Sequence, residues 1–319
     1  MQRGTDQRIE KVSGRAYTVV DAFTSRAFEG NPAAVILDAA GMSDAAMQRI
    51  AAEFNLSETT FILPPDDPAA ADVRFRWFTP AVEATMCGHA TIAGVHALLE
   101  AGMYARLAQG DGGVLRIQTL SGVLETAVEA LRPGGEGRIL WLELPAPRLE
   151  AFALPDRWLT EGLRIGVDEL ADGLPPMRTQ ERDVILFVKR FTTLQDLRPD
   201  FARLVELGRA AGVRGLHVGT TNTLSSSIHV HTRFFAPAVG IHEDPVTGSA
   251  HGPLLAYLVA HGRVEGREGL AAAQCAQGIP GGRSGLVRVL GRVEGSRLVS
   301  VQIGGEAVSV MHGELHREP

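Results

Sequence analysis

Residues 77–82 read WFTPAV, and residues 234–239 repeat this stretch as FFAPAV. A second pair of motifs follows in the same order, with CGHA at 87–90 and TGSA at 247–250. Chance alone would not preserve both the motifs and their order. A repeat of this length indicates two homologous lobes rather than a solenoid, whose repeats are about 20–50 residues long.

An apolar run follows each second motif and ends at a glycine. Gly88 to Gly102 and Gly248 to Gly262 both span 14 positions, so the two runs have the same length. Apolar residues occupy nearly every side of these runs, a pattern typical of a helix inside a fold. We therefore expect a buried central helix in each lobe. The second copy is three residues longer, and the insertion lies between Pro237 and Gly248.

The remaining elements predict an α+β fold of two pseudo-symmetric lobes, each a curved mixed sheet or barrel around its central helix. Strands are expected at 17–20, 32–37, 58–63, 73–78, 184–188 and 228–235, and a helix between the N-cap Ser43 and the left-handed cap Asn55. We assign 12–130 to the first lobe, completed by a strand near 300–315, and 131–299 to the second. The glycine-rich segment 131–137 is the expected connection.

Bulk composition excludes several classes of protein. The 319 residues carry a net charge of -6, which argues against a nucleic-acid binder with a basic face. Cys87 and Cys275 are too few for a disulfide framework and fit a reducing cytoplasm. Apolar runs all fall short of the roughly 18 residues that cross a bilayer, so no membrane partner is expected.

Both central helices begin at a glycine followed by a polar residue, Gly88-His89 and Gly248-Ser249. Helix N-termini present unpaired N–H groups and a partial positive charge. If the lobes face each other across a twofold axis, both N-termini point into one cleft and can hold a carboxylate. Serine is also a common N-cap, so Ser249 fits a purely structural role equally well.

Two carboxylates are candidates for chemistry beside these helices. Glu58 follows a helix and has apolar neighbours that would shield it from water, as a general base requires, although a surface position is the simpler interpretation. Asp244 lies in the three-residue insertion and would hydrogen-bond a substrate or orient His89. Its neighbour Glu243 is expected to act only in helix-start electrostatics.

Several motifs in this order resemble those of the PhzF-like family. They are VDAFT at 20–24, GNPA at 30–33, SET at 57–59, CGHAT at 87–91, EDPVTGSAHGP at 243–253, and QG at 277–278 followed by GR at 282–283. The resemblance covers about 17–312. It implies a diaminopimelate-epimerase-like fold, a homodimer, and a cofactor-free isomerase that moves a proton on a small cyclic or amino carboxylic acid.

The resemblance also implies roles for individual residues. Glu58 corresponds to the glutamate that shifts a proton in the phenazine enzyme, and His89, Asp244 and Ser249 correspond to its supporting residues. In that enzyme the sequence Ala-Gly-His stands where this chain has Cys87-Gly88-His89, so Cys87 replaces an alanine. We expect the substrate site to include Asn31, Cys87, Gly88, Thr247 and Gly248.

Three questions remain open at this point. Diaminopimelate epimerase uses two thiols, but the repeat pairs Cys87 with Thr247, whose hydroxyl is too weak an acid for that role. Cys87 is therefore either a partner of Glu58 or inert packing. A non-catalytic acid-binding or scaffold protein is the alternative function, and a hydrolase or lyase is a weaker one.

Other signals carry less weight. His229 and His231 share one side of a strand, but no HExxH or cysteine pair supports a zinc site, so no metal is expected. The glycine-rich stretches match no nucleotide-binding motif, and no cofactor is expected. Asp183 and residues 198–200 are expected to be solvated loop residues.

Overall fold

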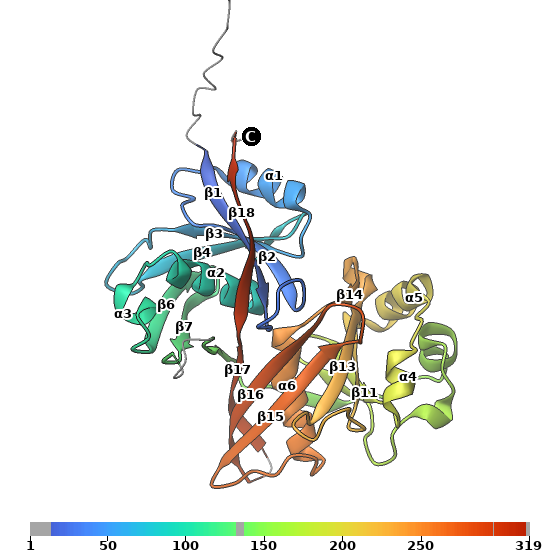
Figure 1. The fold of residues 1–319 in the computed structure, drawn as a ribbon. Helices are drawn as coiled ribbons and strands as arrows, with labels where there is room; N and C mark the ends of the chain where they lie inside the picture. The colour runs from blue at the N-terminus through green and yellow to red at the C-terminus, as the bar shows by residue number, and fades with distance from the viewer. Residues whose placement is uncertain (1–13, 132–136, 296, 317–319) are drawn as a thin grey trace, which may run out of the picture.

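A computed structural model of the chain describes residues 14–131, 137–295 and 297–316 (Figure 1). Its strands form two ladders, one in each lobe. In the first lobe the order is β18 (Ala307–Leu315), β1 (Arg15–Ala22), β2 (Asn31–Ile36), β3 (Thr59–Leu63), β4 (Val73–Phe78), β6 (Gly113–Thr119), β7 (Gly122–Val128) and β8 (Leu140–Leu144). The predicted α+β class is confirmed.

The second lobe repeats this ladder strand for strand. Its order is β9 (Leu149–Ala151), β10 (Met177–Thr179), β11 (Asp183–Phe187), β12 (Gly215–Thr220), β13 (Val230–Ala236), β15 (Leu270–Gly278), β16 (Ser284–Glu294) and β17 (Arg297–Gly305). In both lobes the third and fourth strands are parallel, as are the fifth and sixth, and the other neighbours are antiparallel. The short strands β5 (Glu83–Ala84) and β14 (Ile241–Asp244) pair with β4 and β13.

The last strands of the two ladders, β8 and β17, pair antiparallel and join the lobes. In this register Leu142 lies opposite Ile303. Leu142 pairs with Thr126 of β7, and Ile303 pairs with Val289 of β16, so the two residues hold equivalent positions. A residue and its own equivalent therefore face each other, which places the pseudo-twofold axis at this pair.

The helices differ in how they begin. The outer helices α1 (Asp44–Phe54) and α5 (Phe201–Ala211) start at Ser43 and Asp200, whose side chains accept backbone N–H groups of the first turn. The central helices α2 (Gly88–Glu100) and α6 (Gly248–Ala260) are mostly buried and have no side-chain cap. Figure 1 shows α6 lying behind β15 and β16. The remaining short helices are α3 (Ala105–Ala108), α4 (Phe191–Gln195), and the turns Trp158–Leu163, Val167–Glu169 and Pro237–Val239.

The repeat extends to a partly buried ion pair in each lobe. Arg76 forms a two-pronged pair with Glu83, at 2.7 Å for both contacts, and Arg233 forms the same pair with Glu243, at 2.7 and 2.8 Å. The guanidinium group of Arg233 thus binds both carboxylate oxygens of Glu243.

Asp183 is a correction to the sequence analysis. It is not a solvated loop residue but a buried residue of β11, where its carboxylate binds the guanidinium of Arg214 through two hydrogen bonds. Burial raises the pKa of Asp183, against the opposing effect of Arg214. An alternation pattern alone could not distinguish this paired acid from a surface charge.

The lobe boundaries 12–130 and 131–299 stay a proposal, which the ladders refine at two places. β8 (Leu140–Leu144) continues the first ladder, and β17 (Arg297–Gly305) ends the second. The antiparallel pairing of β18 with β1 supports completion of the first lobe by a C-terminal strand. Residue 12, at which the first lobe was predicted to begin, and residues 132–136, which make up most of the predicted connection, lie outside the described residues.

Candidate active site

Glu58 and His89 face each other at the base of the first lobe. Glu58 immediately precedes β3, and His89 lies in the first turn of α2. The Oε2 atom of Glu58 is 3.3 Å from Nε2 of His89, and their side chains are 16% and 7% exposed. The angles of this contact do not fit a hydrogen bond, and neither atom has a hydrogen-bond partner among the described residues. Both atoms are therefore buried without a hydrogen bond from the described residues.

Cys87 completes this cluster. Its Sγ lies 3.5 Å from Nδ1 of His89, and one donor atom each of Glu58, Cys87 and His89 fall within 4.8 Å of one another. Burial raises the pKa of the Cys87 thiol well above its ordinary value, and the negative charges of Glu58 and Asp244 raise it further. The thiol is therefore protonated at neutral pH.

Asp244 comes from the other lobe, at the end of β14, and both of its carboxylate oxygens are held. Asn31 Nδ2 donates to Oδ1 at 2.8 Å, and the Thr247 hydroxyl donates to Oδ2 at 2.6 Å. Asn31 belongs to the first lobe, so this bond crosses the lobe interface. Its own Oδ1 is buried and lacks a partner among the described residues.

Gln277 is a site residue that the sequence analysis did not assign. This fully buried residue of β15 donates to the carbonyl of Asp244 at 2.7 Å and accepts from the N–H of Thr247 at 2.9 Å. The QG motif at 277–278 contained the signal, but a motif alone does not show which partner a side chain reaches.

The N-termini of the two central helices meet between these groups. A Cβ atom placed on Gly88 would lie 3.8 Å from the backbone nitrogen of Ser249. The N-cap residues Cys87 and Thr247 give no side-chain hydrogen bond to their own helices, in contrast to Ser43 of α1. Uncapped N–H groups from both lobes therefore border one small region, which suits an anion.

His251 supports this arrangement one turn into α6. Its Nδ1 donates to the carbonyl of Thr247 at 2.8 Å, and burial lowers its pKa to about 4. The imidazole is therefore neutral at physiological pH, and it fixes the residue at which α6 begins.

Ser249 is partly exposed and lines a cavity of about 250 Å³. Met86, just before α2, and Arg214 lie in the same wall. The cavity thus opens beside the helix N-termini of both lobes.

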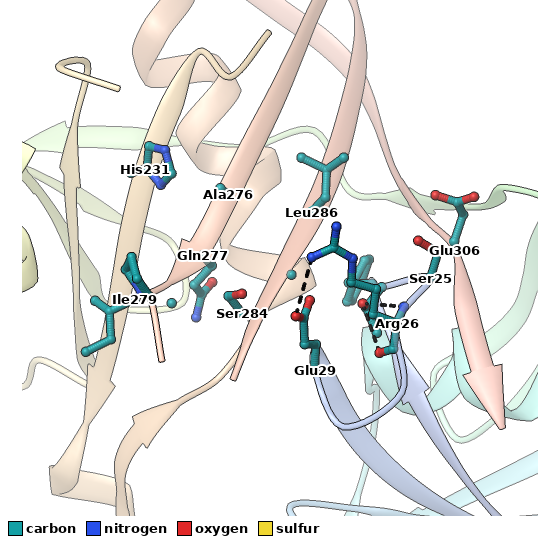
Figure 2. A pocket seen from close by; sticks show the side chains of 15 residues that line it. Ser25, Arg26, Glu29, His231, Ala276, Gln277, Ile279, Ser284, Leu286 and Glu306 are labelled. Carbon is teal, nitrogen blue, oxygen red and sulfur yellow. Dashed lines mark hydrogen bonds and ion pairs between the residues drawn. The ribbon is translucent and has the colours of Figure 1, made fainter. Parts of the chain in front are cut away.

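A second cavity, of about 370 Å³, lies on another flank of the lobe interface (Figure 2). Arg26 and Glu29 approach it from the first lobe, and His231, Gln277 and Ser284 from the second, as the close-up shows. Glu58, His89 and Asp244 are not in its lining, and Gln277 is its link to the Asp244 network.

The strand registers show that the two lobes contribute unlike groups. Thr59 pairs with Phe78 in the first lobe, and Leu216 pairs with Phe235 in the second. Because Phe78 and Phe235 hold the same place in the repeated motif, Gly215 is the equivalent of Glu58. Ala84 similarly takes the place of Asp244. The predicted residues come together, but as an asymmetric site with Glu58, Cys87 and His89 on one side and Asp244, Thr247 and Ser249 on the other.

Comparisons with known proteins agree with this architecture. Residues 20–313 match the family model of phenazine biosynthesis-like proteins, PhzC-PhzF. An uncharacterized isomerase of Clostridium acetobutylicum is 35% identical over 302 residues, which cover 93% of this chain and 96% of that protein. Relatives in Pseudomonas aeruginosa and Escherichia coli are also named isomerases.

Solved structures have the same fold. A PhzF-family protein of Bacillus anthracis has a TM-score of 0.84 at 29% identity, covering 94% of this chain and 98% of its own. A probable proline racemase of Agrobacterium radiobacter has a TM-score of 0.61 at 13% identity, covering 94% and 92%, and shares the fold. Among the described residues, no helix is long and apolar enough to cross a membrane. The chain belongs to the family of phenazine biosynthesis-like proteins, and it is an isomerase.

Proposed function

We propose that the protein moves a proton along a small cyclic or amino carboxylic acid without a cofactor, with Glu58 as general acid and base. One observation carries the proposal. Glu58 and His89, both largely buried and without hydrogen-bond partners among the described residues, face each other where two uncapped helix N-termini meet.

The substrate carboxylate would bind between Gly88 and Gly248. Backbone N–H groups at helix N-termini bind anions through hydrogen bonds and the helix dipole. Neither helix uses a side chain to satisfy these groups, so the two N-termini can share one carboxylate. The substrate carbon next to this carboxylate, from which the proton is removed, would then lie within reach of Glu58.

The remaining groups would orient the substrate. His89, with Nε2 at 3.3 Å from Glu58 Oε2, would contact the substrate beside the base, and Asp244, fixed by Asn31 and Thr247, would accept a hydrogen bond from the substrate. Ser249 would donate one from the opposite helix.

Cys87 does not supply the acid of a two-thiol epimerase. It lies on the same side as Glu58, within 4.8 Å, and the equivalent position in the second lobe is Thr247. Groups that share one side suit removal and return of a proton on one substrate face. We therefore propose a double-bond or positional isomerisation and assign Cys87 to the wall of the site.

The test is deuterium wash-in from D₂O with a panel of amino, dienyl and hydroxy carboxylates, followed by mass spectrometry. Removal of a general base costs about 10²–10⁴-fold in rate, so Glu58→Gln should lower exchange by that factor. Glu53→Gln is the matched control, because Glu53 is an exposed residue of α1 outside the site.

Exchange that survives in Glu58→Gln would contradict the assignment of the base. Binding of an acid with no exchange by the unaltered protein would favour a non-catalytic acid-binding or scaffold protein. A homodimer and a cytoplasmic location stay proposals, supported by the family resemblance and by the cysteine content.

A further inference from the structure

The Glu58, Cys87 and His89 side chains offer the kinds of donor atom that a zinc site uses. They offer one carboxylate oxygen, one sulfur and one imidazole nitrogen within 4.8 Å of one another. Zinc is bound in proteins by these three kinds of atom, and a three-ligand site leaves a fourth position open. Because Glu58 precedes a strand and the other two residues start a helix, the backbone holds all three in place.

Hydrogen bonds satisfy the cluster only in part: Cys87 Sγ contacts His89 Nδ1 at 3.5 Å, but two further polar atoms have no partner among the described residues. His89 is more than nine-tenths buried, and its Nε2 atom lies 3.3 Å from Glu58 Oε2 with no hydrogen bond to either atom among the described residues. Asp244 adds a second carboxylate whose charge reaches Cys87. Buried polar groups normally find partners, so unpaired ones need an explanation.

We propose that this cluster binds one zinc ion and that the bound zinc inhibits the isomerase. The Cys87 thiol loses its proton to solvent as the sulfur–zinc bond forms, while Glu58 binds as a carboxylate and His89 as a neutral imidazole. Binding does not depend on the reaction proposed above. Inhibition does, because zinc would occupy the carboxylate that acts as the base.

Cobalt substitution tests the ligand set. Co²⁺ added to the full-length protein should give a thiolate-to-cobalt charge-transfer band, and one equivalent of Zn²⁺ should abolish it. Cys87→Ala should remove the band, whereas Cys275→Ala, at the other buried cysteine, should keep it. Retention of the band in Cys87→Ala, or its absence in the unaltered protein, would overturn the site.

Affinity measurements distinguish zinc coordination by these side chains from a nonspecific attraction of cations to the negative charge of the cluster. Zinc competition with a fluorescent chelator should give one site per chain, weakened at least about 100-fold in Cys87→Ala and His89→Gln, because loss of even an outer partner of a ligand costs about 10–100-fold. Circular dichroism would check that each variant is folded. Equal affinity in all variants, or Mg²⁺ binding as tight as Zn²⁺, would contradict a site of this kind.

Inhibition is read from the exchange assay, with each rate expressed relative to the same variant without metal. Zinc should suppress exchange by the unaltered protein and leave the relative rate of Cys87→Ala unchanged. Tight zinc binding without suppression would refute the inhibitory role while the metal site stands. A lack of exchange in any condition would count against the proposed reaction and leave the cobalt result valid.

Discussion

At the residue scale, Asp244 is the most constrained carboxylate of the site. Asn31 fixes one oxygen from the first lobe, and Thr247 fixes the other from the second. A carboxylate held at both oxygens keeps one orientation, so its contribution to substrate binding depends on its two donors. Hydrogen bonds to charged groups are worth about 1.5–3 kcal/mol each.

Thr247→Val removes the donor to Asp244 Oδ2 while preserving the shape of the side chain. We expect kcat/KM for the exchanged acid to fall about 10–100-fold, the equivalent of that hydrogen bond. Thr247→Ser restores the hydroxyl and should recover most of the activity. Steady-state kinetics of both variants checks this, and equal losses in the two would show that packing, not the hydrogen bond, matters.

The sequence identified most of the residues of the candidate site but not how their side chains are arranged. The motifs named Glu58, His89 and Asp244 as candidates, because each residue stands in a recognisable order. They could not show that Gln277 reaches the backbone of Asp244 across a distance of 33 residues, or that Asp183 is buried beneath Arg214. Such contacts depend on strand register, which one-dimensional patterns do not contain.

At the scale of single elements, the first residues of the two central helices are packed to different degrees. A Cβ on Gly248 would lie 2.6 Å from the Phe23 ring and 2.8 Å from Ile303, whereas the nearest atom to a Cβ on Gly88 would be 3.4 Å away, also on Ile303. The start of α6 is thus packed against β17 and the loop after β1, and the start of α2 is looser.

This difference predicts opposite responses to the same substitution. Alanine is favoured over glycine in a helix by about 1 kcal/mol, while overpacking costs about 1–3 kcal/mol. Gly88→Ala should therefore leave the free energy of unfolding unchanged or raised, and Gly248→Ala should lower it. Urea unfolding followed by circular dichroism measures both. Equal values for the two variants would contradict the packing described for α6.

Elements with local signals were predicted well. Ser43 and Asn55 mark the ends of α1 as expected, because caps are set by neighbouring residues. The two central helices begin at the predicted glycines. The strand expected from 58 begins at Thr59 instead, which leaves Glu58 just outside the sheet. Pairing partners such as β8 with β17 had no local signal.

At the scale of the whole molecule, the two lobes share one interior. The largest cluster of buried apolar side chains contains Leu98 of α2 and Leu258 of α6 together with Ile303 of β17. Hydrogen bonds between β8 and β17 continue the sheet across the same junction. The duplication was readable from the sequence, but this fusion of the two cores was not.

A shared core predicts that both lobes unfold in one cooperative transition. Trp77 and Trp141 lie in the first lobe and Trp158 in the second, so each lobe has its own fluorescent probe. Trp158→Phe reports the first lobe alone, and the double variant Trp77→Phe/Trp141→Phe reports the second. In urea, each variant should show the same midpoint by fluorescence and by circular dichroism. Two midpoints within one variant would show independent lobes.

The pairing of β1 with β18 has a consequence for synthesis on the ribosome. β1 leaves the ribosome first among the described strands, and its partner β18 follows after all the others. Domains generally fold as units during translation, beginning at the N-terminus. Here the first lobe cannot close as an early unit, and one side of β1 stays unpaired until β18 has been synthesised. An unpaired strand edge is a template for pairing with another chain, so the nascent first lobe is exposed to aggregation during this interval.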